Sequence, residues 1–362
     1  MRAVLLFLPL WLIVVSLNAQ KLTGVVFDSK NSEPVINAHV YIEGSSLHAV
    51  TNLDGKFDIT VNSVVNLPLV ITHISYETMT IFDPFISLPD TIFVTEKANM
   101  LDEVVAQVSR YSRKQLLTAF RREFLGTSQA AGSCIIENEE KIDLWFDYKT
   151  HILTANCDEP VIIYNQYLGY KLYLALEKFE VEYPGSRLGV GTPILVDFEG
   201  STFFEDLEPF NQTVAKRREN VFLGSPSHFL LSLAHNQLDK FDYWLIIKGD
   251  IWVKKAAECF TVIDMNGIKK ILVTPLLVPK SLETYHGWNY YGTVQVQRAR
   301  KEETQLIIFK DHFFIDTWGS STKDLLFVGH MGSLRFGDKL PADYGVTASK
   351  MGFAEIYRDN NY

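Results

Sequence analysis

Hydrophobic and polar residues alternate in short runs over the amino-terminal part of the chain, and turn-forming residues separate the runs. Ala38, Val40 and Ile42 face one side and the residues between them the other, which is the period of a β-strand. The dipeptide Asp54-Gly55 favours a β-hairpin turn between two such runs. The runs lie at 22–27, 34–43, 47–52, 56–61, 67–74, 78–82 and 91–95. Together they predict a small antiparallel β-sandwich of seven strands.

The rest of the chain mixes this strand pattern with helices. Ser112 and Gln115 form a capping box that starts an amphipathic helix near 113–125, and further helices are expected within 205–240. Strands are expected at 134–138, 142–148, 151–156, 160–164, 168–174 and 179–183, and again from 243 to 336. The pattern predicts a larger β-rich α+β domain after the sandwich, so the chain as a whole is mainly β with some α.

The first residues have the layout of a secretory signal peptide. Arg2 supplies a positive charge, Val4–Leu17 is almost entirely apolar, and Ala19 is a small residue suited to cleavage before Gln20. The alternative is a membrane anchor, but about 14 apolar residues are fewer than the roughly 20 that span a bilayer. No cysteine follows the run, so a lipid anchor is not indicated. We expect an exported protein without a transmembrane segment in its mature chain.

Charge and composition narrow the functional classes. The formal net charge is −9, and removal of the leader, whose single charged residue is basic, makes the mature chain more acidic. An acidic protein lacks the basic surface that nucleic-acid binding requires, so we expect no nucleic-acid partner. The length predicts two or three domains, and the 47% of hydrophobic residues predicts well-packed cores.

Cysteine usage leaves the disulfide state open. The mature chain has Cys134, Cys157 and Cys259, and an odd number in an exported protein leaves at least one thiol unpaired. Cys134 and Cys157 flank the strand predicted at 142–148, which would place them on its two neighbours. Strands two apart are separated by about 9.6 Å, too far for a disulfide. We favour three small buried residues over one disulfide.

The stretch Gly24–Tyr76 resembles the carboxypeptidase regulatory-like domain, a transthyretin-like β-sandwich. This module precedes the plug of TonB-dependent outer-membrane receptors of the starch-utilisation type. Leu101–Gln107 is similar to the segment that leaves the module in those receptors, although no plug or barrel pattern follows here. The resemblance implies a sandwich over 20–97, a linker over 98–111 and a second domain over 112–362.

Three segments of the second domain also resemble sequences of known proteins. Leu-Gly-Tyr at 168–170, the segment 224–233 and the segment 329–344 resemble the region that follows this module in exported proteins of Gram-negative envelopes. The match covers about 115–345 and implies a location in the periplasm or at the outer membrane or cell surface. It implies no reaction and no cofactor.

Two His-x₃-Glu spacings are weak candidates for a metal site. They join His39 to Glu43 and His73 to Glu77. Residues four apart on a strand are separated by about 13 Å, too far to share one metal, so we interpret them as exposed positions of a sheet face. No nucleophile elbow, zinc-hydrolase, P-loop or dinucleotide motif is present, and the sequence nominates no catalytic, metal-binding or cofactor-binding residue.

Two further groups of residues are explained by structure or solvation, without a ligand. His228 and His235 are about 10.5 Å apart along one predicted helix, so they do not share a metal, and we expect His228 to be packed or to cap the helix. The basic segments 121–122 and 216–218 are suited to lipid phosphates, but solvated helix faces are the more common use of such clusters.

The strongest candidate for ligand binding is an aromatic loop between glycines. Its rings belong to Tyr285, Trp288, Tyr290 and Tyr291. Exposed rings of this kind stack on sugars or peptides, whereas rings on the inner face of a hairpin would fill a core. Both interpretations are open at this point.

Three functions follow from these observations. The first is an exported, non-enzymatic interaction or assembly protein that binds an envelope protein, a peptide or a glycan. The second is a hydrolase-type enzyme whose site is dispersed over the second domain. The third is a structural component associated with an outer-membrane receptor. A pocket where titratable groups with shifted pKa values converge would favour the enzyme.

Overall fold

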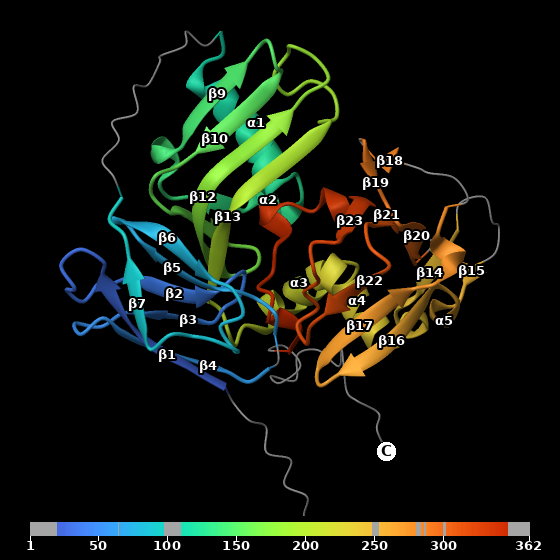
Figure 1. The fold of residues 1–362 in the computed structure, drawn as a ribbon. Helices are drawn as coiled ribbons and strands as arrows, with labels where there is room; N and C mark the ends of the chain where they lie inside the picture. The colour runs from blue at the N-terminus through green and yellow to red at the C-terminus, as the bar shows by residue number, and fades with distance from the viewer. Residues whose placement is uncertain are drawn as a thin grey trace, which may run out of the picture.

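The computed structural model describes residues 20–63, 65–97, 110–247, 253–279, 284–285, 287–299 and 302–346. The predicted signal peptide, most of the predicted linker and residues 347–362 lie outside these ranges. The described chain is mainly β with a few helices, as predicted (Figure 1). It builds three large hydrophobic cores. No helix of the described ranges is long and apolar enough to cross a membrane.

The amino-terminal module is the predicted seven-stranded sandwich. Its strands are β1 (Gln20–Asp28), β2 (His39–Ile42), β3 (His48–Val50), β4 (Lys56–Val61), β5 (Leu69–His73), β6 (Tyr76–Ile81) and β7 (Thr91–Val94). One sheet has the order β4-β1-β7 and the other β3-β2-β5-β6, so the strands that flank Asp54-Gly55 belong to different sheets. The turn forms, with Gly55 at φ +74°, but it crosses between sheets and is not the predicted hairpin. A Cβ at Gly55 would come within 2.5 Å of the Val26 carbonyl oxygen, so the turn needs glycine.

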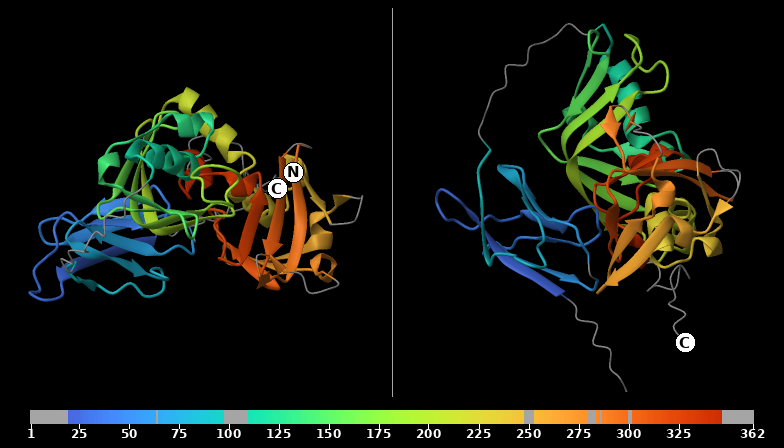
Figure 2. Two further views of the ribbon diagram at one scale, coloured as in Figure 1. Left: turned by 90° about the horizontal axis from the view of Figure 1, so that it is seen from above. Right: turned by 45° about the vertical axis from the view of Figure 1, so that its right-hand side comes forward.

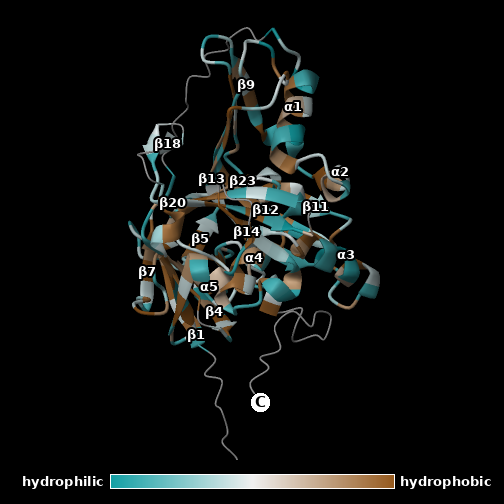
Figure 3. Cartoon of the chain, turned by 90° about the vertical axis from the view of Figure 1, so that its right-hand side faces the viewer, coloured by the Kyte–Doolittle hydropathy of each residue, from teal (hydrophilic) through white to brown (hydrophobic). Residues whose placement is uncertain are grey.

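The middle module is a six-stranded antiparallel sheet covered by a helix. Its strands are β8 (Cys134–Ile136), β9 (Asp143–Asp147), β10 (Ile152–Asn156), β11 (Val161–Asn165), β12 (Tyr170–Glu182) and β13 (Leu195–Asp206). Helix α1 (Arg113–Leu125) has the predicted capping box at Ser112, and α2 (Gln129–Gly132) follows. Phe120 and Phe124 of α1 lie edge-on to Phe179 of β12, at 5.5 and 5.3 Å between ring centroids. Figure 3 shows α1 with hydrophilic positions between the hydrophobic ones, as an amphipathic helix requires.

The cysteines are buried free thiols, but their placement differs from the prediction. The sheet order is β8-β11-β12-β10-β9, with β13 beside β12. Cys134 on β8 therefore lies at the opposite edge of the sheet from β9, while Cys157 directly follows β10. All three thiols are within the described ranges and none is in a disulfide. The error arose because the order of strands in the sheet is not their order in the chain.

The third module combines helices with two sheets around a core of its own. Its helices are α3 (Gln212–Phe222), α4 (Pro226–Ala234) and α5 (Ala256–Cys259). One sheet has the order β15-β14-β20-β21-β23 and the other β16-β17-β22. The strands are β14 (Tyr243–Ile246), β15 (Val253–Lys254), β16 (Phe260–Met265), β17 (Ile268–Val273), β20 (Gly292–Arg298), β21 (Glu302–Ile308), β22 (His312–Ile315) and β23 (Leu325–Gly329). A separate two-stranded hairpin is formed by β18 (Thr284–Tyr285) and β19 (Trp288–Asn289).

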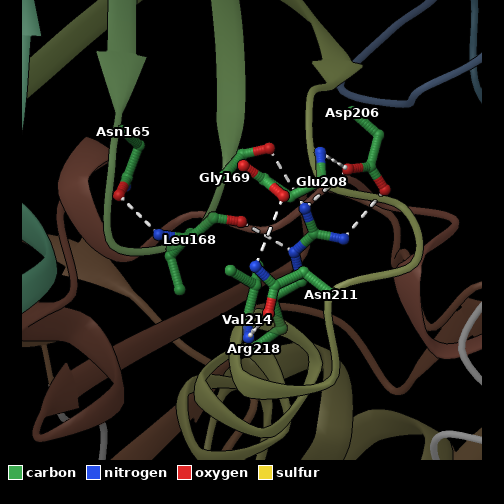
Figure 4. A network of polar contacts seen from close by, with 8 residues as sticks. All are labelled: Asn165, Leu168, Gly169, Asp206, Glu208, Asn211, Val214 and Arg218. Carbon is green, nitrogen blue, oxygen red and sulfur yellow. Dashed lines mark hydrogen bonds and ion pairs between the residues drawn. The ribbon is translucent and has the colours of Figure 1, made fainter.

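Arg218 of α3 ties the third module to the middle sheet (Figure 4). Its guanidinium forms two hydrogen bonds with the Asp206 carboxylate, at 2.8 and 2.6 Å, and donates to the Leu168 and Gly169 carbonyl oxygens. It also stacks over the Tyr170 ring at 3.8 Å, and its side chain is only 7% exposed. The solvated basic face expected at 216–218 is therefore wrong for Arg218, because this arginine is a buried structural cation.

His228 is packed, as expected. It is fully buried, its backbone N–H is capped by the Ser225 hydroxyl, and its Nδ1 lies 2.7 Å from the Tyr243 hydroxyl. Burial lowers the pKa of His228 to about 3, so the ring is neutral at physiological pH.

Candidate binding site

The sandwich and the middle sheet enclose a groove between them. Both views in Figure 2 show the two modules (blue and green) side by side. The groove has a volume of about 790 Å³, and a hollow of about 430 Å³ adjoins it and shares part of its wall. One wall comes from β2, β5 and the turn into β6, and the other from β12 and the segment after β10. Residues from two modules therefore line a single cavity.

Aromatic rings form the floor where the two modules meet. Ala38, Val40 and Ile42 face the sandwich core, so the alternation of β2 directs His39 and Tyr41 outward. The Phe203 ring of β13 lies 5.4 Å from His39 and 4.7 Å from Tyr41. Tyr41 and Ser201 share a hydrogen bond of 2.6 Å. The face that the sequence predicts as exposed is thus covered by the second half of the chain.

His39 is neutral in this setting. Its ring lies against those of Tyr173 and Phe203, and its Nδ1 is buried without a hydrogen-bond partner in the described structure. Burial lowers the pKa of His39, and the nearby charges of His48, His73 and Lys171 lower it further. The neutral imidazole therefore offers an apolar ring surface to the groove, and its Nδ1 is left to accept or donate one hydrogen bond.

The rim of the groove is strongly acidic. The carboxylates that line the groove and its adjoining hollow are Glu77, Glu137, Glu140, Asp158, Glu159 and Glu177. The one lysine among the lining residues is Lys97, which donates to the Asp158 carbonyl oxygen at 3.1 Å. These carboxylates come from strands and loops far apart in the sequence, and together they give the groove a negative potential.

Neither His-x₃-Glu pair makes a metal site. His73 and Glu77 both line the groove, but a turn separates them. Glu43 faces a different cavity from its partner His39. Among the described residues there is no cluster of three or more side chains that could hold a metal ion.

The predicted aromatic site lies elsewhere, on the β18–β19 hairpin. Tyr285 pairs with Trp288 across the hairpin, and Trp288 is 73% exposed. Tyr291 is 36% exposed, while Tyr285 and Tyr290 are half-buried. The interpretation of Trp288 as a core residue is therefore wrong. None of the four rings lines the groove, so the structure separates the predicted site from the cavity between modules.

The comparisons with known proteins concern the first module. A family model for the CarboxypepD_reg-like domain matches residues 22–106, which contain the whole sandwich from Leu22 onward. No curated protein matches the chain. The match covers residues 22–106 and concerns this part of the chain alone. The amino-terminal part of this protein is a carboxypeptidase regulatory-like domain.

Proposed function

We propose that this protein is an exported, non-enzymatic interaction or assembly protein of the cell envelope, and that its groove binds a basic peptide segment of a partner protein. The observation that carries the proposal is the acidic groove between the sandwich and the middle sheet. Six carboxylates line the groove and its adjoining hollow, and the aromatic floor lies between them. Lys97 is the one lining lysine, and Lys141 pairs with only one of the carboxylates, Glu159. Lysine and arginine side chains suit such a site, because their stems pack on rings while their charges reach the rim.

The chemistry of the groove supports binding over catalysis. His39 and His73 line it, and burial is the main cause that lowers the pKa of each. A histidine with a lowered pKa is a weaker base, so burial does not prepare either ring for proton abstraction. The geometry instead offers a long open surface with charge on its edges.

Peptide binding is tested by fluorescence anisotropy with the mature chain. The probes are a labelled peptide of alternating lysine and valine and a matched peptide of alternating glutamate and valine. We expect the basic peptide to bind, with an affinity that falls as salt rises, and the acidic peptide not to bind. Equal binding of the two peptides would contradict the proposal.

A pair of variants locates the binding. Glu77→Gln with Glu177→Gln removes two rim charges and should weaken binding of the basic peptide at least tenfold. The matched control is Asp197→Asn with Glu199→Gln, two exposed positions of β13 outside the groove. Loss of affinity in the control as well would assign the effect to net charge and not to the groove.

Glycan stacking on the β18–β19 hairpin is a second candidate function. It is favoured by the exposure of Trp288 and its cross-strand pairing with Tyr285. Retention of the protein on immobilised oligosaccharides should be lost in Trp288→Ala and kept in the groove variant. Export itself is tested by mass spectrometry of the protein from the native cell, which should find Gln20 at the amino terminus.

A further inference from the structure

A second cavity lies where all three modules meet. It has a volume of about 370 Å³ and is separate from the acidic groove. Its walls come from the turn after β2, from β13, from helices α3 and α4, and from the segment 338–342. We call it the junction cavity.

Backbone hydrogen bonds hold the walls of the junction cavity in place. The Gly44 N–H donates to the Thr202 carbonyl oxygen at 2.7 Å, and the Phe204 N–H donates to Ser45 at 2.9 Å. On the other side the Ala342 N–H donates to the Gly44 carbonyl oxygen at 2.8 Å. The turn of the sandwich is therefore clamped between β13 and the carboxyl-terminal segment, and the cavity is largely preformed.

Glu43 brings a carboxyl group whose hydrogen bonds are only half satisfied. Its Oε1 accepts a hydrogen bond from the Thr202 N–H at 3.1 Å, whereas its Oε2 is buried with no hydrogen-bond partner in the described structure. Burial raises the pKa of Glu43 to about 7, although the Thr202 hydrogen bond and the charges of Lys339 and Lys323 oppose the shift. An unpaired buried oxygen of this kind favours any ligand that donates to it.

Lys339 brings the opposite charge to the same cavity. Its Nζ lies 4.2 Å from the centre of the Phe336 ring. Lys339 is an exposed residue, so its ammonium is accessible to solvent as well as to a ligand in the cavity. The two charges act on each other only at a distance, since no ion pair within 4.0 Å joins them. Asp338 also lines the cavity.

The remaining wall is mostly apolar. It is formed by Leu67, Phe204, Val221, Phe222, Met331, Leu334, Leu340 and Pro341, with a few serines and threonines. A preformed cavity with hydrophobic walls and a few fixed polar groups is the usual form of a small-molecule site. Its volume is enough for a ligand of about the size of one amino acid.

We propose that the junction cavity binds a small zwitterion with a hydrophobic side chain, such as a free aromatic or branched α-amino acid. The ligand ammonium donates to Oε2 of Glu43, and the ligand carboxylate accepts from Nζ of Lys339. The side chain packs against Phe222 and its hydrophobic neighbours. Each end of the ligand pairs a protein charge that is otherwise unpaired, so the charges of site and ligand cancel.

The test is isothermal titration of the mature chain with four compounds. L-phenylalanine carries every feature, N-acetyl-L-phenylalanine lacks the ammonium, phenethylamine lacks the carboxylate, and glycine lacks the side chain. We expect L-phenylalanine to bind and to raise the melting temperature, and each of the other three to bind at least tenfold more weakly. No binding of L-phenylalanine at millimolar concentration, or equal binding of the acetylated form, would overturn the proposal.

Variants place the ligand in the junction cavity. Glu43→Gln and Lys339→Met should each weaken L-phenylalanine at least tenfold, while the exposed controls Glu199→Gln and Lys56→Met should not. Unchanged affinity in both cavity variants would overturn the site. If a cavity variant fails to fold, titration of the natural protein with the four compounds still tests whether both charged ends of the ligand are needed for binding. The groove charges are untouched throughout, so this result is independent of the peptide-binding test.

Discussion

Two of the borders between the sandwich and the rest of the chain differ in kind. At one, Trp318 of the third module enters the hydrophobic core of the sandwich and is 2% exposed. At the other, Tyr173 and Phe203 of the middle sheet cover the outer face of β2 and β5, and the groove opens beside them. The first border is closed and the second leaves space.

Hydrogen bonding is found at both borders and does not by itself separate them. Asp316 holds the Trp318 border by accepting from the backbone N–H groups of Asn66, Trp318 and Ser320. Each border nevertheless buries a ring nitrogen that has no hydrogen-bond partner in the described structure, Nε1 of Trp318 at the closed border and Nδ1 of His39 at the open one. What differs is the cavity: a border that completes a core serves stability, whereas a border that opens onto a cavity is free to serve binding.

The largest expected effect is at the closed border. Trp318→Ala removes a buried indole from the sandwich core, so the free energy of unfolding should fall by about 3–5 kcal/mol. Urea unfolding followed by circular dichroism measures the change. A loss below about 1 kcal/mol would show that the sandwich core is complete without Trp318.

A smaller effect is expected at the open border from Tyr41→Phe. The change leaves the Ser201 hydroxyl without its partner and should cost about 1 kcal/mol. The double variant with Ser201→Ala should recover part of this loss, which a double-mutant cycle measures. Strictly additive losses would show that the hydrogen bond contributes nothing to the border.

The open border should also respond to pH. The folded pKa of His39 lies below its ordinary value of 6.5, so the unfolded chain takes up the proton first. Its contribution to stability is present above about pH 6.5 and is lost as the pH falls below that value. The folded pKa of Glu43 is raised, so the folded chain takes up that proton first. The contribution of Glu43 to stability therefore decreases as the pH rises from about 4.5 to about 7.

Comparing the natural protein with His39→Phe isolates this effect, because Glu43 and the buried His228 are common to both. Urea unfolding at a series of pH values should show a shallower loss of stability below pH 6.5 in the variant. Parallel curves for the two proteins would show that His39 does not sense pH.

The smallest effect is expected away from both borders. Trp288→Ala removes a largely exposed ring, so the free energy of unfolding should change by no more than about 0.5 kcal/mol. Thermal melting beside Trp318→Ala compares an exposed with a buried tryptophan. A loss of stability as large as that of Trp318→Ala would show that Trp288 is a core residue, which would contradict a glycan site on the hairpin.

Local patterns were enough to predict the sandwich and the first helix. The seven strands follow from alternation and turn residues, and α1 follows from its capping box at Ser112. Both signals lie within a few residues of the element that they specify. The Asp54-Gly55 turn was found for the same reason, but which sheet each flanking strand joins depends on distant partners.

The candidate sites could not be predicted because their residues meet only in the folded chain. His39 and Glu43 read as one exposed strand face, and only their contacts with Phe203 and Thr202 show that they are covered. Arg218 was grouped with its basic neighbours, although Asp206 and the Tyr170 ring bury it. The alternation of hydrophobic and polar residues along the chain does not predict contacts between residues that are distant in sequence.

The placement of Trp318 has a consequence for how the chain folds as it is made. In synthesis and in export alike, the sandwich sequence emerges ahead of residue 318, and domains generally fold as units in order from the amino terminus. The hydrophobic core of the sandwich is therefore incomplete until the Trp318 indole, from far downstream in the chain, packs against it. Contacts between such distant segments form slowly. We expect the newly made sandwich to be the part of the chain that depends most on a chaperone.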